Sequence, residues 1–113
     1  MHELSVAQSI VETAVEEAQA HGASRVVGIN LQLGRMSGVQ REPLEFGFEI
    51  SSKGTAAEGA TLKITEIPLT IRCRSCGAES GVEAWEFICR VCESGDVEIL
   101  TGRELAIVSL DVE

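Results

Sequence analysis

Apolar residues recur at steps of three and four along the first part of the chain, which predicts one face of an amphipathic helix. These residues are Leu4, Ala7, Ile10, Val11, Ala14, Val15 and Ala18. Ser5 and Gln8 have the spacing of a capping box near its start. His21-Gly22 predicts the end of the helix, because glycine tolerates the left-handed backbone conformation that closes one.

The next segment alternates strictly between apolar residues and polar or small ones. Its apolar positions are Val27, Ile29, Leu31 and Leu33, a pattern typical of a half-buried strand. Segment 43–53 is ambiguous, because its apolar residues alternate as in a strand and are also spaced as neighbours on a helix. Since proline suits the first helical turn and glycine follows at position 54, we predict a helix there.

The second half predicts further strands and one segment of a different kind. Apolar positions change from even to odd at Glu66-Ile67-Pro68, and proline cannot donate to a ladder, so two strands should meet there. Residues 104–112 predict a terminal strand with its apolar residues on one face. Residues 72–102 are rich in Cys, Gly and polar residues and hold too few apolar ones to fold alone.

These elements predict an α+β protein with a small insertion before its last strand. A chain of 113 residues is long enough for one compact unit. The body would comprise residues 1–71 and 103–113, and the insertion residues 72–102. Only four residues are aromatic, so the core should consist mainly of Val, Ile, Leu and Ala.

The charge of the chain, its lack of long apolar stretches and its first residues limit the kinds of partner and the compartment that we expect. Nine basic against 18 acidic residues give a net charge of −9, which repels nucleic acid and anionic membranes. No apolar stretch approaches the ~20 residues of a membrane span. The first residues lack the basic lead and apolar run of a secretory signal. We therefore expect a cytoplasmic protein whose thiols stay reduced.

Four cysteines form two CxxC pairs separated by twelve residues: Cys73, Cys76, Cys89 and Cys92. Two such turns facing each other complete the tetrahedron of a structural Zn²⁺ site. Four sulfur ligands leave no open position, so the site should be structural and not catalytic. A short hairpin carrying Trp85 and Phe87 could cover it. Iron in a rubredoxin-like site, two disulfides or four unrelated thiols are the alternatives.

The first three residues form a second candidate metal site. The amine of Met1, the backbone nitrogen of His2 and its Nδ1 can close consecutive chelate rings, with the backbone nitrogen of Glu3 as a further donor. Coplanar nitrogens suit Ni²⁺ or Cu²⁺, while the Glu3 carboxylate offers an octahedral alternative. A histidine at the second position is more commonly just the frayed start of a helix. His21 suits the last helical turn, where the macrodipole favours it.

Taken together, these segments resemble the HypA/HybF family of nickel metallochaperones for [NiFe]-hydrogenase maturation. The resemblance rests on Met-His-Glu-Leu-Ser at residues 1–5, the CxxCG…CxxC pattern, and Gly-Arg-Glu-Leu at residues 102–105. It covers essentially the whole chain. The chain departs from the family pattern at Arg90, where proline is common, and at Glu93, where glycine is common. It also has Arg35-Met36 where an acidic-hydrophobic pair is common.

The resemblance implies a site, a fold and partners. Nickel would bind at Met1, His2 and Glu3, and a structural zinc at Cys73, Cys76, Cys89 and Cys92. The fold would be a small mixed three-stranded sheet with two helices, joined to an inserted zinc-ribbon subdomain with four cysteine ligands. A nickel GTPase, HypB, and the hydrogenase large subunit would be the partners. The protein receiving nickel (a hydrogenase or a urease) and the choice between monomer and homodimer stay open.

Two other classes of function compete with a nickel carrier. One is a zinc-ribbon adaptor that binds protein and transfers no nickel. The other is an enzyme, which the sequence disfavours, because no Ser/His/Asp or Cys/His set suggests itself and the cysteines are all committed to a metal. We therefore predict a nickel metallochaperone that is not an enzyme.

Overall fold

A computed structural model describes residues 3–83 and 86–113 of the chain. The chain divides into two compact units. The first comprises the chain up to Gln32, Gly38–Thr65 and Ala106–Glu113, and the second comprises Leu33–Ser37 and Glu66–Leu105. Among the helices of the described residues, none has the length and apolar character needed to cross a membrane.

Helix α1 (Glu3–Ala20) follows the predicted period of apolar residues. Its buried side is formed by Ala7, Ile10, Val11, Ala14 and Ala18. Gly22 follows with a φ of 79°, the left-handed conformation expected at the helix end. The capping box at Ser5 and Gln8 was wrong, because the helix already includes Glu3.

Strands β1 (Val26–Gly34), β2 (Thr61–Ile67) and β6 (Leu105–Val112) form a three-stranded sheet in the order β2-β1-β6. The β1–β6 pair is antiparallel, because Glu113 N donates to Arg25 O at one end and Gly34 N donates to Glu104 O at the other. Ile29, Leu31 and Leu33 of β1 are buried as predicted, whereas Val27 is 36% exposed.

Strand β2 runs parallel to β1, which makes the sheet mixed. Val26 N donates to Ala56 O just before β2 begins, and Arg35 N donates to Ile67 O at its end. A parallel pair requires a crossover, and helix α2 (Arg41–Ser52) supplies it. The predicted helix is thus confirmed, and the chain turns at Gly54 with a φ of 77°.

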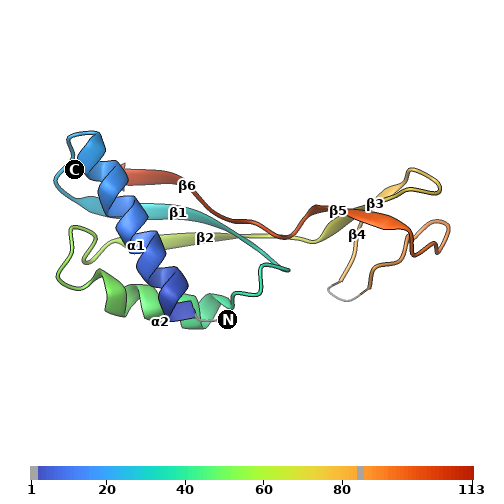
Figure 1. Ribbon diagram of the computed structural model, residues 1–113, viewed down its shortest axis with the longest axis horizontal. Helices are drawn as coiled ribbons and strands as arrows, with labels where there is room; N and C mark the ends of the chain where they lie inside the picture. Colours follow the sequence, from blue (N-terminus) through green and yellow to red (C-terminus); the bar gives the residue numbers. More distant parts are fainter. Residues whose placement is uncertain (1–2, 84–85) are drawn as a thin grey trace. The chain divides into compact units, whose positions relative to one another are not determined.

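The two helices of the first unit pack closely at Gly47 of α2. A Cβ atom at this position would lie 3.2 Å from the Cβ of Ala7 and 3.4 Å from the Cα of Leu4. Leu44 and Phe48 face inward beside it and are buried. Figure 1 shows the first turns of α1 beside α2. The small residue at 47 therefore sets how near α2 comes to the start of α1.

A second sheet lies in the second unit. Strand β3 (Thr70–Cys73) pairs antiparallel with both β4 (Glu79–Gly81) and β5 (Val97–Thr101). The break predicted at Pro68 thus separates β2 from β3, while β4 and β5 carry too weak a pattern to be predicted. A small core of Leu69, Ile71 and Val82 is extended by Met36, Phe87, Val97 and Ile99.

The sequence places glycines at both ends of the loop from Gly34 to Gly38, and this loop begins where two backbone segments come into contact. A Cβ atom at Gly34 would overlap the backbone carbonyl group of Gly102. Met36 N donates to Gly102 O at 2.6 Å, so the two segments are hydrogen-bonded at this point. Only glycine at position 34 allows this approach, which explains one of the two glycines that the sequence places there.

Candidate metal centre

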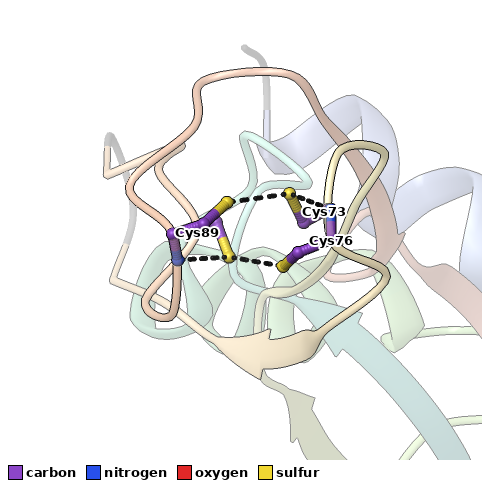
Figure 2. Close-up of side chains that lie close together, drawn as sticks. Cys73, Cys76 and Cys89 are labelled. Atoms are coloured by element: carbon purple, nitrogen blue, oxygen red, sulfur yellow. Dashed lines mark hydrogen bonds between the residues drawn. The ribbon is translucent and has the colours of Figure 1, made fainter.

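Two turns with the same hydrogen-bond pattern carry the four cysteines. In the first, Gly77 N donates to Cys73 O and Cys73 N donates to Ala78 O, both at 2.9 Å. In the second, Glu93 N donates to Cys89 O and Cys89 N donates to Ser94 O, again both at 2.9 Å. Figure 2 shows the sulfur atoms of the two turns facing one another. The CxxC spacing therefore produces matching turns, as the sequence predicted.

Backbone amides within each turn point at the first sulfur. Ser75 N and Cys76 N donate to Cys73 Sγ at 3.3 and 3.4 Å. Val91 N and Cys92 N donate to Cys89 Sγ at the same two distances. Amide donors favour a thiolate over a thiol, so both turns are prepared for negatively charged sulfur.

The four sulfur atoms have the separations of a metal tetrahedron. All lie within 4.8 Å of one another, and the Cys73–Cys92 and Cys76–Cys89 pairs are each 3.6 Å apart. A Zn–S bond of ~2.3 Å gives a tetrahedron edge of ~3.8 Å, close to these values. The cysteines are free, and 3.6 Å is far longer than the ~2.05 Å of a disulfide. The residues present therefore fit a metal ion.

Without a metal, the sulfurs differ in their affinity for protons. The Cys76 amide, joined by the Ser75 amide, lowers the pKa of Cys73 to about 6. The Ser94 amide favours the Cys92 thiolate as well, but the other three sulfurs together with burial outweigh it and raise its pKa to about 12. Four crowded sulfurs cannot all ionise together unless a cation compensates their charge.

Side chains around the cysteines tie the two turns together. Ser75 Oγ lies 3.2 Å from Ser94 Oγ, joining one turn to the other. Arg74 Nη1 donates to Asp96 Oδ1 at 3.0 Å and to Val97 O at 3.1 Å. The contacts of these supporting residues could not be predicted from the sequence, since serine and arginine in a polar loop carry no periodic signal.

The second predicted site lies only partly within the described residues. Met1 and His2 fall outside them. Glu3 is the first described residue of α1, and its Oε2 accepts a hydrogen bond from Gln40 N at 3.3 Å. His21 Nδ1 donates to Glu17 O at 2.9 Å, so this histidine completes the last turn of α1 as expected.

Comparison with known proteins decides the family. The sequence model described as "Hydrogenase/urease nickel incorporation, metallochaperone, hypA" matches residues 1–112. The chain belongs to this family. The hydrogenase maturation factor HypA of Chlorobaculum tepidum is 43% identical over 113 residues, covering all of both chains. That of Roseiflexus sp. is 42% identical over 114 residues, covering all of this chain and 93% of the relative.

Solved structures of the family share the fold. The solution structure of the Ni metallochaperone HypA from Helicobacter pylori matches with a TM-score of 0.69 at 24% identity, covering 99% of this chain and 97% of that one. A second solution structure, of a HypA protein, matches with a TM-score of 0.75 at 24% identity, covering 100% and 97%. The predicted α+β fold with two helices, a mixed sheet and a four-cysteine ribbon is confirmed.

Membership of the HypA family also confirms the predicted class of function. The family consists of metallochaperones for nickel incorporation in hydrogenase maturation. Such proteins carry a metal and catalyse no reaction, so the expectation that the chain is not an enzyme is confirmed as well. A four-cysteine cluster able to hold a metal such as zinc accompanies this function.

Arg90, which lies between the two cysteines of the second turn, makes a defined contact. Its Nε donates to Gly81 O at 3.0 Å, and its Nη2 lies 3.7 Å from Glu86 Oε2. Arginine therefore fastens the second cysteine turn to the end of β4. Proline at this position would lack these two side-chain contacts.

Glu93, which follows the second turn, adopts a conformation that suits glycine. Its φ is 63°, the equivalent of 80° at Gly77 in the first turn. A left-handed residue with a side chain costs ~1–2 kcal/mol relative to glycine. Relief of this strain should make Glu93→Gly stabilise the metal-loaded second unit by about 1 kcal/mol. The greater conformational entropy of glycine in the unfolded chain offsets part of this gain.

Chemical denaturation of metal-loaded protein, followed through signals of the second unit, measures this effect. Gly77→Ala is the matched variant and should destabilise the same unit, because alanine is strained at a φ of 80°. Equal stability of Glu93→Gly and the native protein would contradict the prediction.

Proposed function

We propose that the chain binds Ni(II) reversibly through Met1, His2 and Glu3 and delivers it for assembly of the [NiFe]-hydrogenase active site. The observation that carries this proposal is full-length membership of the nickel-incorporation family, together with the sequence Met-His-Glu at residues 1–3. In this proposal, residues 1–71 and 103–113 are the nickel-binding body, and residues 72–102 are the zinc-binding insertion.

The proposed nickel donors are the Met1 amine, the His2 backbone nitrogen and Nδ1, and the Glu3 backbone nitrogen. Such a set closes adjacent chelate rings in one plane, the arrangement that Ni²⁺ accepts more readily than Zn²⁺ does. The Glu3 carboxylate already accepts a hydrogen bond from Gln40 N. The planar nitrogen set requires no ligand from this carboxylate.

Zn(II) is the proposed resident ion of Cys73, Cys76, Cys89 and Cys92. Four sulfur ligands complete its coordination, so the ion would hold the ribbon together and bind no substrate. The amides that point at Cys73 and Cys89 would compensate part of the charge of the thiolates. Residues of this chain thus supply all ligands and their nearest hydrogen bonds.

The proposed partners are the nickel GTPase HypB, which would exchange nickel with the chain, and the hydrogenase large subunit, which would receive it. A net charge of −9 suits partners that present basic surfaces, and such complementarity raises association rates more than affinity. The cytoplasm is the proposed compartment, because free thiols persist in its reducing conditions.

Nickel titration of the untagged, zinc-loaded protein tests the proposal. We expect one equivalent of nickel to bind, with an absorption spectrum of planar coordination. A matched preparation that carries an N-terminal extension should bind far more weakly, because the extension converts the Met1 amine into an amide. Equal nickel affinity of the two preparations would contradict the donor assignment, and no nickel uptake by the untagged protein would contradict the function.

A further inference from the structure

Strand β6 lies at one edge of the first sheet, whose strand order is β2-β1-β6. Figure 1 shows β6 and β2 on opposite sides of β1. In the part of the chain that the structure describes, no further strand pairs with β6. An edge strand of this kind presents backbone amide and carbonyl groups that can pair with another strand.

The hydrogen bonds at the end of β6 show which of its backbone groups face outward. Glu113 N donates to Arg25 O, and Arg25 N donates to Glu113 O, so the backbone groups of Glu113 face β1. Successive residues of an antiparallel strand direct these groups alternately to its two sides. The residues whose backbone groups face away from β1 are therefore Val108, Leu110 and Val112.

The side chains of the same three residues form an apolar row beside helix α1, which we name the β6 row. Val108 is 61% exposed and Val112 44%, and Leu110 is half-buried. A groove of about 520 Å³ lies between this row and α1, where the small side chains of Ala14 and Ala18 line its other side. Apolar side chains left in water along a strand edge favour burial against another chain.

The polar side chains of β6 are turned toward β1 and not toward the free edge. The strand contains no proline and a single charged residue, Asp111. Its carboxylate lies over β1, since a Cβ atom at Gly28 would be 2.7 Å from Asp111 Oδ2. Beside it, Asn30 Nδ2 donates to Ser109 Oγ at 2.9 Å. The features that normally prevent pairing of a strand edge are therefore absent from β6.

The opposite edge of the sheet differs in this respect. Strand β2 carries the exposed charged residues Lys63 and Glu66. Charged side chains on an edge strand oppose pairing with a further strand, because they would lose water in the contact. The sheet thus has one edge protected by charge and one edge that is apolar and open.

Strand β6 is complementary to a second copy of itself. A two-fold axis through Leu110 places Val108 opposite Val112 of the second copy in an antiparallel pair. The outward backbone groups of the two rows then face one another, and the side chains of both rows lie on the same face of the joined sheet. Neither row contains a charged residue, so the pairing requires no compensating charge from another protein.

We propose that two copies of the chain associate by antiparallel pairing of β6 with β6 about this axis, which joins their two three-stranded sheets into one. Each copy would close the open side of the groove of the other. The inference does not depend on the proposed nickel function. Because each copy has a net charge of −9, apolar contact and backbone pairing would have to overcome electrostatic repulsion. Salt should therefore strengthen the dimer.

Sedimentation equilibrium of the untagged, zinc-loaded protein at two ionic strengths tests the association. We expect a monomer–dimer equilibrium whose dissociation constant falls as salt is added, because salt screens the repulsion between two acidic copies. A protein that stays monomeric up to millimolar concentration at both ionic strengths would overturn the proposal. A dimer that salt weakens would also overturn it, because charge pairs would then hold the copies together.

Replacement of Val108 tests the position of the contact. We expect Val108→Lys to raise the dissociation constant of the dimer by more than about tenfold. Each dimer loses two buried valines and would have to bury two ammonium groups. Circular dichroism verifies the fold of the variant, which should persist because this side chain lies mostly in water in a single copy.

The matched control is Thr65→Lys, at an exposed position of the other edge strand. It changes the net charge by the same amount and should dimerise at least as well as the native protein, because the repulsion between copies is lower. Unchanged dimerisation of Val108→Lys, or an equal loss in both variants, would refute pairing through β6.

Amide hydrogen exchange of the native protein gives a pattern specific to edge pairing and needs no variant. The amides of the β6 row should exchange at least about tenfold more slowly in concentrated, dimeric protein than in dilute, monomeric protein. The amides of Ser109 and Asp111 face β1 and should be protected at both concentrations. No change in the β6 row on dimerisation, or equal changes along the whole strand, would refute the proposed pairing.

Discussion

His2→Ala should lower the nickel affinity of the untagged protein by at least about 100-fold. The imidazole is a direct donor in the proposed site, and loss of even a supporting hydrogen bond to a metal ligand costs ~10–100-fold. The zinc content and the helical circular dichroism signal should stay unchanged, since the four cysteines lie elsewhere in the chain. Isothermal titration with nickel and elemental analysis of zinc measure both expectations.

His21→Ala is the matched control for this variant. His21 is the other histidine of the chain, and its Nδ1 donates to Glu17 O at the end of α1. We expect its replacement to leave nickel affinity unchanged. Acetylation of the Met1 amine is a second, independent change and should reduce nickel binding without altering any side chain. Nickel affinity equal to that of the native protein in both His2→Ala and acetylated protein would refute the terminal chelate.

Removal of zinc, or Cys89→Ser, should unfold strands β3, β4 and β5 while α1 and α2 persist. The second unit has only a small core around Leu69, Ile71 and Val82, and zinc binding supplies roughly 10–16 kcal/mol in isolated zinc-finger peptides. Cys89 is 1% exposed, and its sulfur accepts hydrogen bonds from two backbone amides. The change to serine therefore removes the sulfur that serves both as a metal ligand and as the acceptor of these hydrogen bonds.

Amide NMR spectra with and without a chelator follow each unit separately. Signals of residues 66–105 should collapse to the range of an unfolded chain, while those of α1 and α2 keep their dispersion. Val91→Ala, within the same turn but 72% exposed, is the matched control and should retain zinc. Native-like signals from β3 to β5 in zinc-free protein would contradict a structural role for the ion.

Zinc uptake should also release protons. At pH 7, Cys73, whose pKa is about 6, is mostly ionised, and Cys92, whose pKa is about 12, is protonated. Binding requires four thiolates, so zinc displaces at least the Cys92 proton, and affinity falls as the pH falls. A pH indicator in weakly buffered solution measures the release. Uptake of zinc without proton release would contradict this description of the metal-free cluster.

The local features of this protein could be predicted from its residues. The three- and four-residue period of α1, the alternation in β1 and the break at Pro68 each depend on residues that are close together in the sequence. The CxxC spacing likewise predicts two turns, because each turn is closed by bonds such as Gly77 N to Cys73 O. Local order of this kind depends on backbone geometry over a few residues, which sequence patterns represent well.

Other features needed contacts between distant segments. Strands β4 and β5 gain their structure from pairing with β3, since neither has a strong pattern of its own. Arg90 and Ser75 acquire roles only where Gly81 and Ser94 come near them. A chain pattern contains no information on which loop approaches which, because these contacts join residues far apart in the sequence.

Sequence alone determined the metal chemistry available to this protein: two CxxC pairs with four sulfur ligands, and a Met-His-Glu terminus proposed for nickel. Only the tertiary structure decided which residues stay in water. Phe46 and Phe48 are two residues apart on one helix, yet Phe48 is 4% exposed and Phe46 65%. The physical reason is that α1 packs against one side of α2 at Gly47, and helical spacing by itself does not specify which side a neighbour covers.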